Sequence, residues 1–136
     1  MLNAVTDVIV LGDLPDLQSL GARRAEPAPG DAPLAARVCA EITRLTPTPP
    51  LLIVTVGEYC ALLPAIALAQ RAARRRVVGY VLIDPDYPAV SESWPDARVH
   101  VLGTSESNLR TAELRGWETG HASGLHDLVR EIVLSE

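Results

Sequence analysis

Apolar runs that do not alternate with polar positions mark the strands of this chain. Residues 51–56 (LLIVTV) and 77–83 (VVGYVLI) are almost wholly apolar, which is the pattern of strands covered on both faces. Residues 5–11 (VTDVIVL) are rich in β-branched side chains and precede a Gly-Asp pair, and residues 98–102 form a shorter run before a glycine. We expect a strand in each of these segments, with a fifth candidate over 115–119.

Between the strands, apolar residues recur every three or four positions, which is the spacing of a helix with one buried face. Asp31 is expected to cap the first such helix, which covers residues 34–45 and ends at the proline-rich segment TPTPP. The segment before it, residues 14–33, is rich in Pro, Gly and Ala and predicts a long irregular connection. Further helices are expected over about 60–75, 108–114 and 125–133.

This alternation of strands and helices predicts an α/β fold. We expect a three-layer sandwich in which helices cover both faces of a mainly parallel sheet of four to five strands. The chain has 136 residues, the length of one domain, so residues 1–136 are assigned to a single domain. Functional groups in such sheets gather in the loops that leave the carboxyl ends of the strands. Those loops are residues 12–15, 57–60, 84–88, 103–106 and 120–124.

Composition excludes several classes of function. The formal net charge of −5 argues against nucleic acid or an anionic membrane as a partner, and no stretch reaches the ~18 apolar residues of a membrane span. All 12 basic residues are arginines, which excludes Schiff-base and P-loop chemistry through lysine. The two cysteines, Cys39 and Cys60, make neither a disulfide framework nor a zinc site. We expect a cytoplasmic protein without a metal or another cofactor.

Residues 57–61 (GEYCA) form a tight turn between a strand and a helix, the place where a nucleophile elbow lies. The stretch LLIVTVGEYCALLPAIALAQRA, followed by VVGYVLIDPDYP, resembles the central strand, elbow and next strand of the α/β-hydrolase family. Residues 114–121 (LRGWETGH) are similar to the turn that bears the catalytic histidine of that family. The resemblance covers about residues 50–136 and implies a minimal core without the N-terminal hairpin and the lid.

Three substitutions in the elbow depart from the family. Tyr59 stands where the family has its nucleophilic serine, Ala61 replaces the second glycine, and Glu58 replaces the usual histidine. A phenol with an ordinary pKa of about 10 is a poor acyl acceptor, so ester hydrolysis through Tyr59 is not expected. Two interpretations stay open. Tyr59 fills the former pocket as a half-buried aromatic residue, or its hydroxyl, on a strained turn, serves as an acid or hydrogen-bond donor.

His121 is the general base that the resemblance implies, and its small neighbours on a turn would expose the imidazole. Asp84, at the end of a strand, is the preferred acid to orient it, with Asp86 and Glu106 as alternatives. Each residue also has a simpler interpretation. A carboxylate at the end of a strand commonly caps the next turn, and His121 can be a turn residue without a functional role.

The resemblance further implies an oxyanion or substrate site formed by the loop of Asp13 and Leu14. A backbone N–H near Leu14 would act with that of Cys60, and Glu106 would border the same site. Cys60 has a second interpretation, because the positive end of a helix lowers the pKa of a thiol and can make it a nucleophile. The alternative is a small buried cysteine.

Three functions are compatible with these residues. The resemblance implies non-hydrolytic acid–base chemistry (isomerisation, cyclisation, elimination or epimerisation) on a small molecule, in a biosynthetic pathway of the kind for which bacteria recruit this fold. One alternative is an inactive pseudo-hydrolase that binds a ligand or a partner. A second alternative is a Cys60-dependent acyl hydrolase or transferase. The exposed edges of a small sheet also predict a homodimer.

Overall fold

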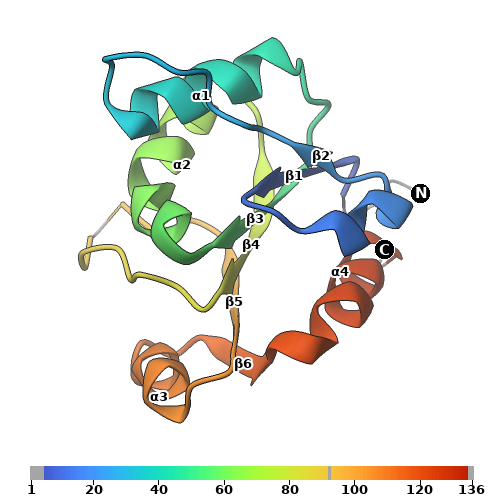
Figure 1. Ribbon diagram of the computed structural model, residues 1–136, viewed down its shortest axis with the longest axis vertical. Coiled ribbons are helices and arrows are strands. Elements are labelled where there is room, and N and C mark those ends of the chain that lie inside the picture. Colours follow the sequence, from blue (N-terminus) through green and yellow to red (C-terminus); the bar gives the residue numbers. More distant parts are fainter. Residues whose placement is uncertain (1–4, 92, 135–136) are drawn as a thin grey trace.

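A parallel sheet organises the molecule (Figure 1). The computed structural model describes residues 5–91 and 93–134. Within these residues six strands follow the order β2-β1-β3-β4-β5-β6, and every neighbouring pair is parallel. The strands are β1 (Asp7–Leu11), β2 (Arg23–Arg24), β3 (Leu51–Val56), β4 (Val77–Ile83), β5 (Arg98–Gly103) and β6 (Glu118–His121).

In the described ranges, helical segments connect these strands everywhere except between β4 and β5. The α-helices of the described chain are α1 (Leu34–Arg44), α2 (Leu63–Ala72), α3 (Glu106–Leu114) and α4 (Leu125–Leu134). Shorter 3₁₀ segments are η1 (Pro15–Leu20), η2 (Gly57–Leu62) and η3 (Ala122–Gly124). The expected α/β class and the parallel sheet are therefore confirmed.

The expected number of four to five strands is wrong, because the described residues form six. The missed strand, β2, is an arginine pair inside the segment that was expected to be irregular, and no apolar pattern marks it. Tertiary contacts hold it in place: Arg23 donates to the carboxylate of Asp7 at 3.1 Å and to the carbonyl of Leu45 at 2.8 Å. β6 begins at Glu118 rather than at residue 115, and its edge position leaves its polar side chains exposed.

Two helix starts also differ from expectation. Asp31 does not cap α1: the N-cap is Pro33, and no side chain caps that helix. The helix expected from about residue 60 begins as the 3₁₀ segment η2 and becomes α-helical at Leu63. Pro64 lies in the first turn of α2, where its missing N–H removes no helical hydrogen bond.

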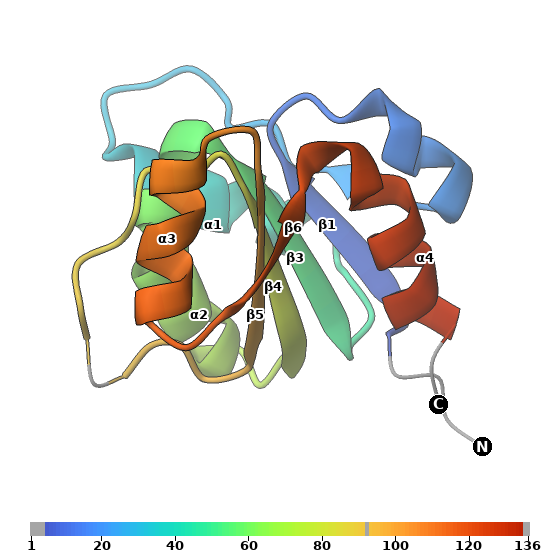
Figure 2. The ribbon, with the colours of Figure 1, turned by 90° about the horizontal axis from the view of Figure 1, so that it is seen from below.

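The sheet separates two clusters of buried apolar side chains. One contains Ile9 and Leu11 of β1 with residues of α1, α2 and α3; the other contains Val8 and Val10 with residues of η1 and α4. Figure 1 shows α1 and α2 on one side of the sheet and α4 on the other, and Figure 2 shows the strands side by side between them. Successive residues of a strand therefore enter different clusters, which explains why its sequence does not alternate.

The order of the strands places a topological switch between β1 and β3. From β1 the chain moves outward to β2 and then returns to the other side of β1 as β3. Open α/β sheets bind ligands in the crevice at such a point, outside the carboxyl ends of the strands. Gly12 leaves β1 there with φ 122°, a conformation that favours glycine, and a Cβ on it would lie 3.0 Å from the Cβ of Val56 at the end of β3.

Substitution Gly12→Ala tests this close approach. We expect it to lower the free energy of unfolding by about 2–4 kcal/mol, because it combines backbone strain with overpacking against Val56. Urea denaturation followed by circular dichroism measures the change. Gly30→Ala is the matched control, since a Cβ there meets its nearest atom at 3.7 Å. Equal stability of the two variants would contradict the proposed constraint.

Candidate functional site

The loop after β1 lines a pocket at the carboxyl edge of the sheet. The pocket has an empty volume of about 330 Å³ and contains Asp13 and Leu14, the two residues expected near an oxyanion or substrate site. Arg24 also lines it, with its guanidinium 4.0 Å from the carboxylate of Asp13. Its remaining lining comes from Val10, Gly12, Pro15, Gln18 and Ala22, all on the β1–β2 side of the switch point.

Tyr59 lies in η2, directly after β3. Its side chain is half-buried and packs against the apolar cluster shared by α1 and α2. The positive φ that the elbow interpretation expects at this residue is found instead at Gly57 (φ 57°), where glycine adopts it without strain, and Tyr59 is not among the described residues with positive φ. The turn therefore does not hold Tyr59 in the strained conformation that presents a nucleophile.

Cys60 is fully buried behind this turn. Its Sγ lies 3.1 Å from the hydroxyl of Thr55, which donates a hydrogen bond to it. Burial raises the pKa of the Cys60 thiol to about 11, and the nearby charge of Asp86 adds to the increase. At neutral pH the side chain is thus a protonated thiol, and the position at the start of a helical segment does not offset the loss of solvation.

Asp84 holds the turn that follows β5. The backbone N–H of Thr104 donates to its Oδ1 at 2.9 Å, and the Thr104 hydroxyl lies 3.4 Å from the same oxygen. Asp84 itself is exposed and has φ 43°, a left-handed conformation that Asp tolerates better than most residues. These contacts give Asp84 a structural role, but at the turn that follows the neighbouring strand β5 rather than at the turn directly after its own strand.

His121 ends β6 and bonds to its own turn. The backbone N–H of Ser123 donates to Nδ1 at 3.0 Å, and the Ser123 hydroxyl lies 2.8 Å from the same nitrogen. Because a backbone N–H only donates, Nδ1 is an acceptor and the proton of the neutral ring is on Nε2. A general base that is oriented by a carboxylate carries its proton on Nδ1 instead.

The other carboxylates considered at this edge have separate positions. Glu106 is the exposed first residue of α3 and lines shallow surface hollows with other α3 residues, such as Arg110. Asp86 lies nearer to the elbow, since its backbone N–H donates to the carbonyl of Gly57 at 3.1 Å. The structure thus brings Asp86 and Cys60 together, while Asp84 and His121 each bond within a different turn. The Tyr59–His121–Asp84 triad stays a prediction.

A second pocket of about 490 Å³ contains residues that the sequence patterns did not indicate as functional. It is lined by Trp94 of the β4–β5 connection and by Arg115 and Trp117 of the turn between α3 and β6. The sequence offered a weak indication, because aromatic residues are only 4% of the chain and both tryptophans are here. Their spacing alone does not show that the fold brings them together.

Comparisons with protein families, with curated proteins and with solved structures find no match to this chain. Among the described residues, no helix has the length and apolar character needed to cross a membrane. Within the same residues, no group of three or more His, Cys, Asp or Glu side chains is placed to hold a metal ion.

Alkylation with iodoacetamide tests the state of Cys60. At neutral pH we expect Cys60 to stay unmodified in the folded Cys39→Ser variant and to react fully once urea unfolds it, as intact mass will show. The reaction of the folded protein should appear only as the pH approaches about 11. Stability from this buried thiol is complete below its ordinary pKa of 9.0 and is lost as the pH rises toward 11.

The Cys60→Ser variant is the control for this experiment, because it retains only Cys39. Burial also raises the pKa of Cys39, but its side chain is partly exposed. We therefore expect slow but measurable alkylation of Cys39 in the folded protein. Alkylation of folded Cys60 at the rate of a free thiol would contradict the burial argument.

Substitutions of Asp84 test its structural role. We expect Asp84→Ala to lower the free energy of unfolding by about 1–2 kcal/mol, because the N–H of Thr104 loses its acceptor. Asp84→Asn should stay within about 0.5 kcal/mol of the wild type, since an amide oxygen still accepts and Asn tolerates a left-handed backbone. Urea denaturation measures both variants. A stable Asp84→Ala protein would return Asp84 to consideration as a catalytic acid.

Proposed function

We propose that this chain is a binding protein with an α/β-hydrolase-like core, in which the former catalytic positions maintain the fold and a small molecule is bound without conversion. The proposal includes the three-layer arrangement of that family. The parallel sheet and the two buried clusters on its faces support this arrangement. The proposal also retains the expected homodimer and cytoplasmic location. Exposed apolar side chains on the face of α2 and α3, Leu68 and Leu114, are of the kind that a second copy could cover.

The single observation that carries the proposal is the hydrogen bonding of His121. Its Nδ1 is occupied by the N–H and the hydroxyl of Ser123, two residues along the chain. An acid behind the imidazole is what gives a histidine base its tautomer, its orientation and support for its positive charge. Here Ser123 holds the ring instead, so His121 is better suited to terminating β6 than to removing a substrate proton.

The residues around the elbow support the same conclusion. Tyr59 packs on the apolar cluster below it, and the thiol of Cys60 is buried and protonated. Neither side chain presents an activated nucleophile at the carboxyl edge. The repurposed acid–base enzyme and the Cys60-dependent acyl transferase remain the competing proposals, and both need these groups to be accessible and activated.

Equilibrium dialysis against a defined small-molecule library tests the proposal. Mass spectrometry of both compartments reports which compounds the protein retains and which it consumes. We expect retained compounds with no consumption, and we expect the same compounds to be retained by the Tyr59→Phe and His121→Ala variants. The matched control is His126→Ala, because His126 lies on α4, its Nε2 bonds to the hydroxyl of Ser19, and it has no role in the expected triad.

Two results would overturn the proposal. One is a compound that the wild type converts and that His121→Ala, still folded by circular dichroism, converts at least about a hundredfold more slowly, as expected for a lost general base. The other is an acyl adduct on Cys60 after incubation with activated esters at neutral pH. If the protein neither retains nor converts any library compound, small-molecule binding is excluded for the chemistry that the library covers.

A further inference from the structure

The connection between β4 and β5 crosses the sheet without a helix. Neighbouring parallel strands are usually joined by a helical crossover. Here residues 84–91 and 93–97 form neither helix nor strand, and they lie on the face of the sheet that carries α2 and α3 (yellow to orange in Figure 1). Tyr87 and Trp94 of this loop join the apolar cluster on that face. Aromatic side chains thus occupy the position of a covering helix.

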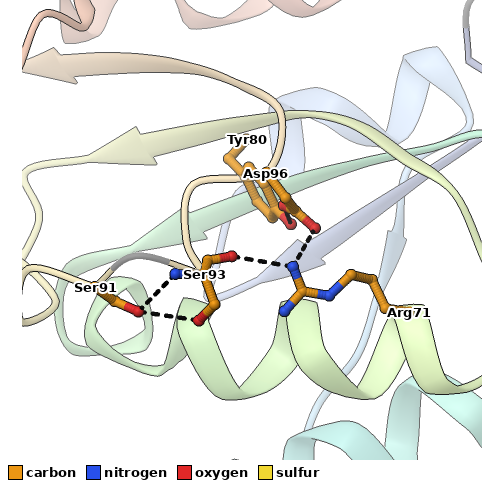
Figure 3. Close-up of polar contacts among 5 residues, drawn as sticks. All are labelled: Arg71, Tyr80, Ser91, Ser93 and Asp96. Atoms are coloured by element: carbon orange, nitrogen blue, oxygen red, sulfur yellow. Dashed lines mark hydrogen bonds and ion pairs between the residues drawn. The ribbon is translucent and has the colours of Figure 1, made fainter.

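The second half of the loop is anchored to β4 and α2. The hydroxyl of Tyr80 donates to the carboxylate of Asp96 at 2.6 Å, and Arg71 donates to Asp96 at 3.4 Å and to the carbonyl of Ser93 at 3.0 Å (Figure 3). Burial, followed by the hydrogen bond to Asp96, raises the pKa of Tyr80, so the phenol keeps its proton and remains a donor. Asp96 is therefore a fixed point for the chain next to Trp94.

The first half of the loop is anchored to α3. The hydroxyl of Tyr87 donates to the carbonyl of Asn108 at 2.6 Å, and Nη1 of Arg115 donates to the carbonyl of Pro88 at 3.0 Å. Between the two anchored halves the chain stands away from the core, since the side chain of Val90 is 88% exposed. The loop is thus held at both ends around a hollow.

Indole rings form the floor of this hollow. Trp94 meets the ring of Tyr80 at 5.4 Å and that of Trp117 at 5.5 Å, both edge to face, so the three rings pack into one apolar cluster in which Tyr80 and Trp94 are buried and Trp117 is partly exposed. The resulting pocket is open to solvent on one side, and its empty volume, solvent-open space included, is about 490 Å³. It is lined by residues 89–91, Trp94, Pro95, Arg115 and Trp117.

Arg115 brings a positive charge to this apolar pocket. Its guanidinium lies 5.1 Å from the ring centre of Tyr87 and 5.2 Å from that of Trp117, which holds it in one position. Among the residues that the structure describes, Arg115 forms no ion pair, whereas Arg23, Arg71 and Arg98 each contact a carboxylate. Four of its five N–H groups remain after the bond to Pro88. A guanidinium that is fixed in place beside aromatic rings is complementary to an anion that carries an apolar body, because the charge pairs with the anion and the rings contact the apolar part.

We propose that the hollow formed by residues 89–91, Trp94, Arg115 and Trp117 binds a small organic carboxylate with a flat apolar body. The carboxylate pairs with the guanidinium of Arg115, and the apolar body covers Trp94 and Trp117. This inference rests on the proposed function, because it gives that function a ligand class and a place on the molecule. It uses none of the carboxyl-edge residues.

Tryptophan emission reports on this pocket alone, because both tryptophans of the chain line it. The probe is 4-phenylbutyrate, and the matched neutral probe is 4-phenylbutyramide, which has almost the same shape. We expect the acid to change the emission saturably, with an affinity about tenfold higher than that of the amide, the preference expected from one charge-assisted contact. Acetate, which lacks the apolar body, should produce no saturable change at the same concentrations.

Variants separate the charge from the rings. Arg115→Gln should weaken binding of the acid about tenfold and remove its preference over the amide, while Arg110→Gln, one turn earlier on the exposed side of α3, should change neither. Since Arg115→Gln also loses contacts to the loop, Ala89→Phe provides an independent test. It fills the pocket from an exposed position, leaves Arg115 in place and should abolish binding of both probes.

Equal affinity of the acid and the amide, or unchanged binding in Ala89→Phe, would overturn the inference. So would the absence of any saturable change with millimolar probe. These failures are distinct from failure of the proposed function. If dialysis retains other compounds while the phenylbutyrate titration is flat, the protein is a binding protein with a different ligand class. If a compound is converted at the carboxyl edge, the proposed function fails whatever the pocket binds.

Discussion

Burial of both faces of the parallel sheet is the constraint on which the rest of this structure depends. Its strands are apolar on both sides and have to be covered by other parts of the chain. Helices α1, α2 and α3 cover one face, and η1 with α4 covers the other. The connection from β4 to β5 has no helix to contribute, and the aromatic side chains of Tyr87 and Trp94 take its place. The aromatic pocket lies where this replacement leaves a gap in the covering layer.

The polar groups at the carboxyl edge serve the same constraint. A short loop that follows a buried strand contains backbone N–H groups that need hydrogen-bond acceptors, and nearby side chains provide these acceptors. Asp84 accepts from Thr104 and thereby links the end of β4 to the turn after β5. His121 accepts from Ser123 and closes the turn into α4. A side chain that accepts a backbone hydrogen bond in this way has less freedom to orient a catalytic partner. The contacts that stabilise the carboxyl edge of the sheet therefore also support the proposed loss of catalysis.

The proposed ligand site in the aromatic pocket also depends on the layer that covers the sheet. The chain of contacts from Tyr80 through Asp96 to Arg71 fixes the loop on one side, and Arg115 fixes it on the other. Rings and guanidinium are therefore already in position before any ligand arrives. Such preorganisation reduces the entropy lost on binding, so a shallow site with a single cation can still select for an anion of the right shape.

Much of this fold follows from the sequence alone. The buried strands β3 and β4 lie where their unbroken apolar runs predict them, because a strand covered on both faces has no polar positions to interrupt it.

Local pattern also placed the polar candidate residues at the ends of the strands. Local pattern could not show contacts between distant residues. β2 exists only because Ile9 and Val10 pair with two arginines, and the tautomer of His121 depends on its hydrogen bond from Ser123. Trp94 lies about twenty residues before Arg115 and Trp117 in the sequence, and only the packing of the β4–β5 loop against α3 and β6 brings it beside them. Periodicity reports burial within one element, whereas a site is formed by side chains from several elements, and that proximity is a property of the tertiary structure.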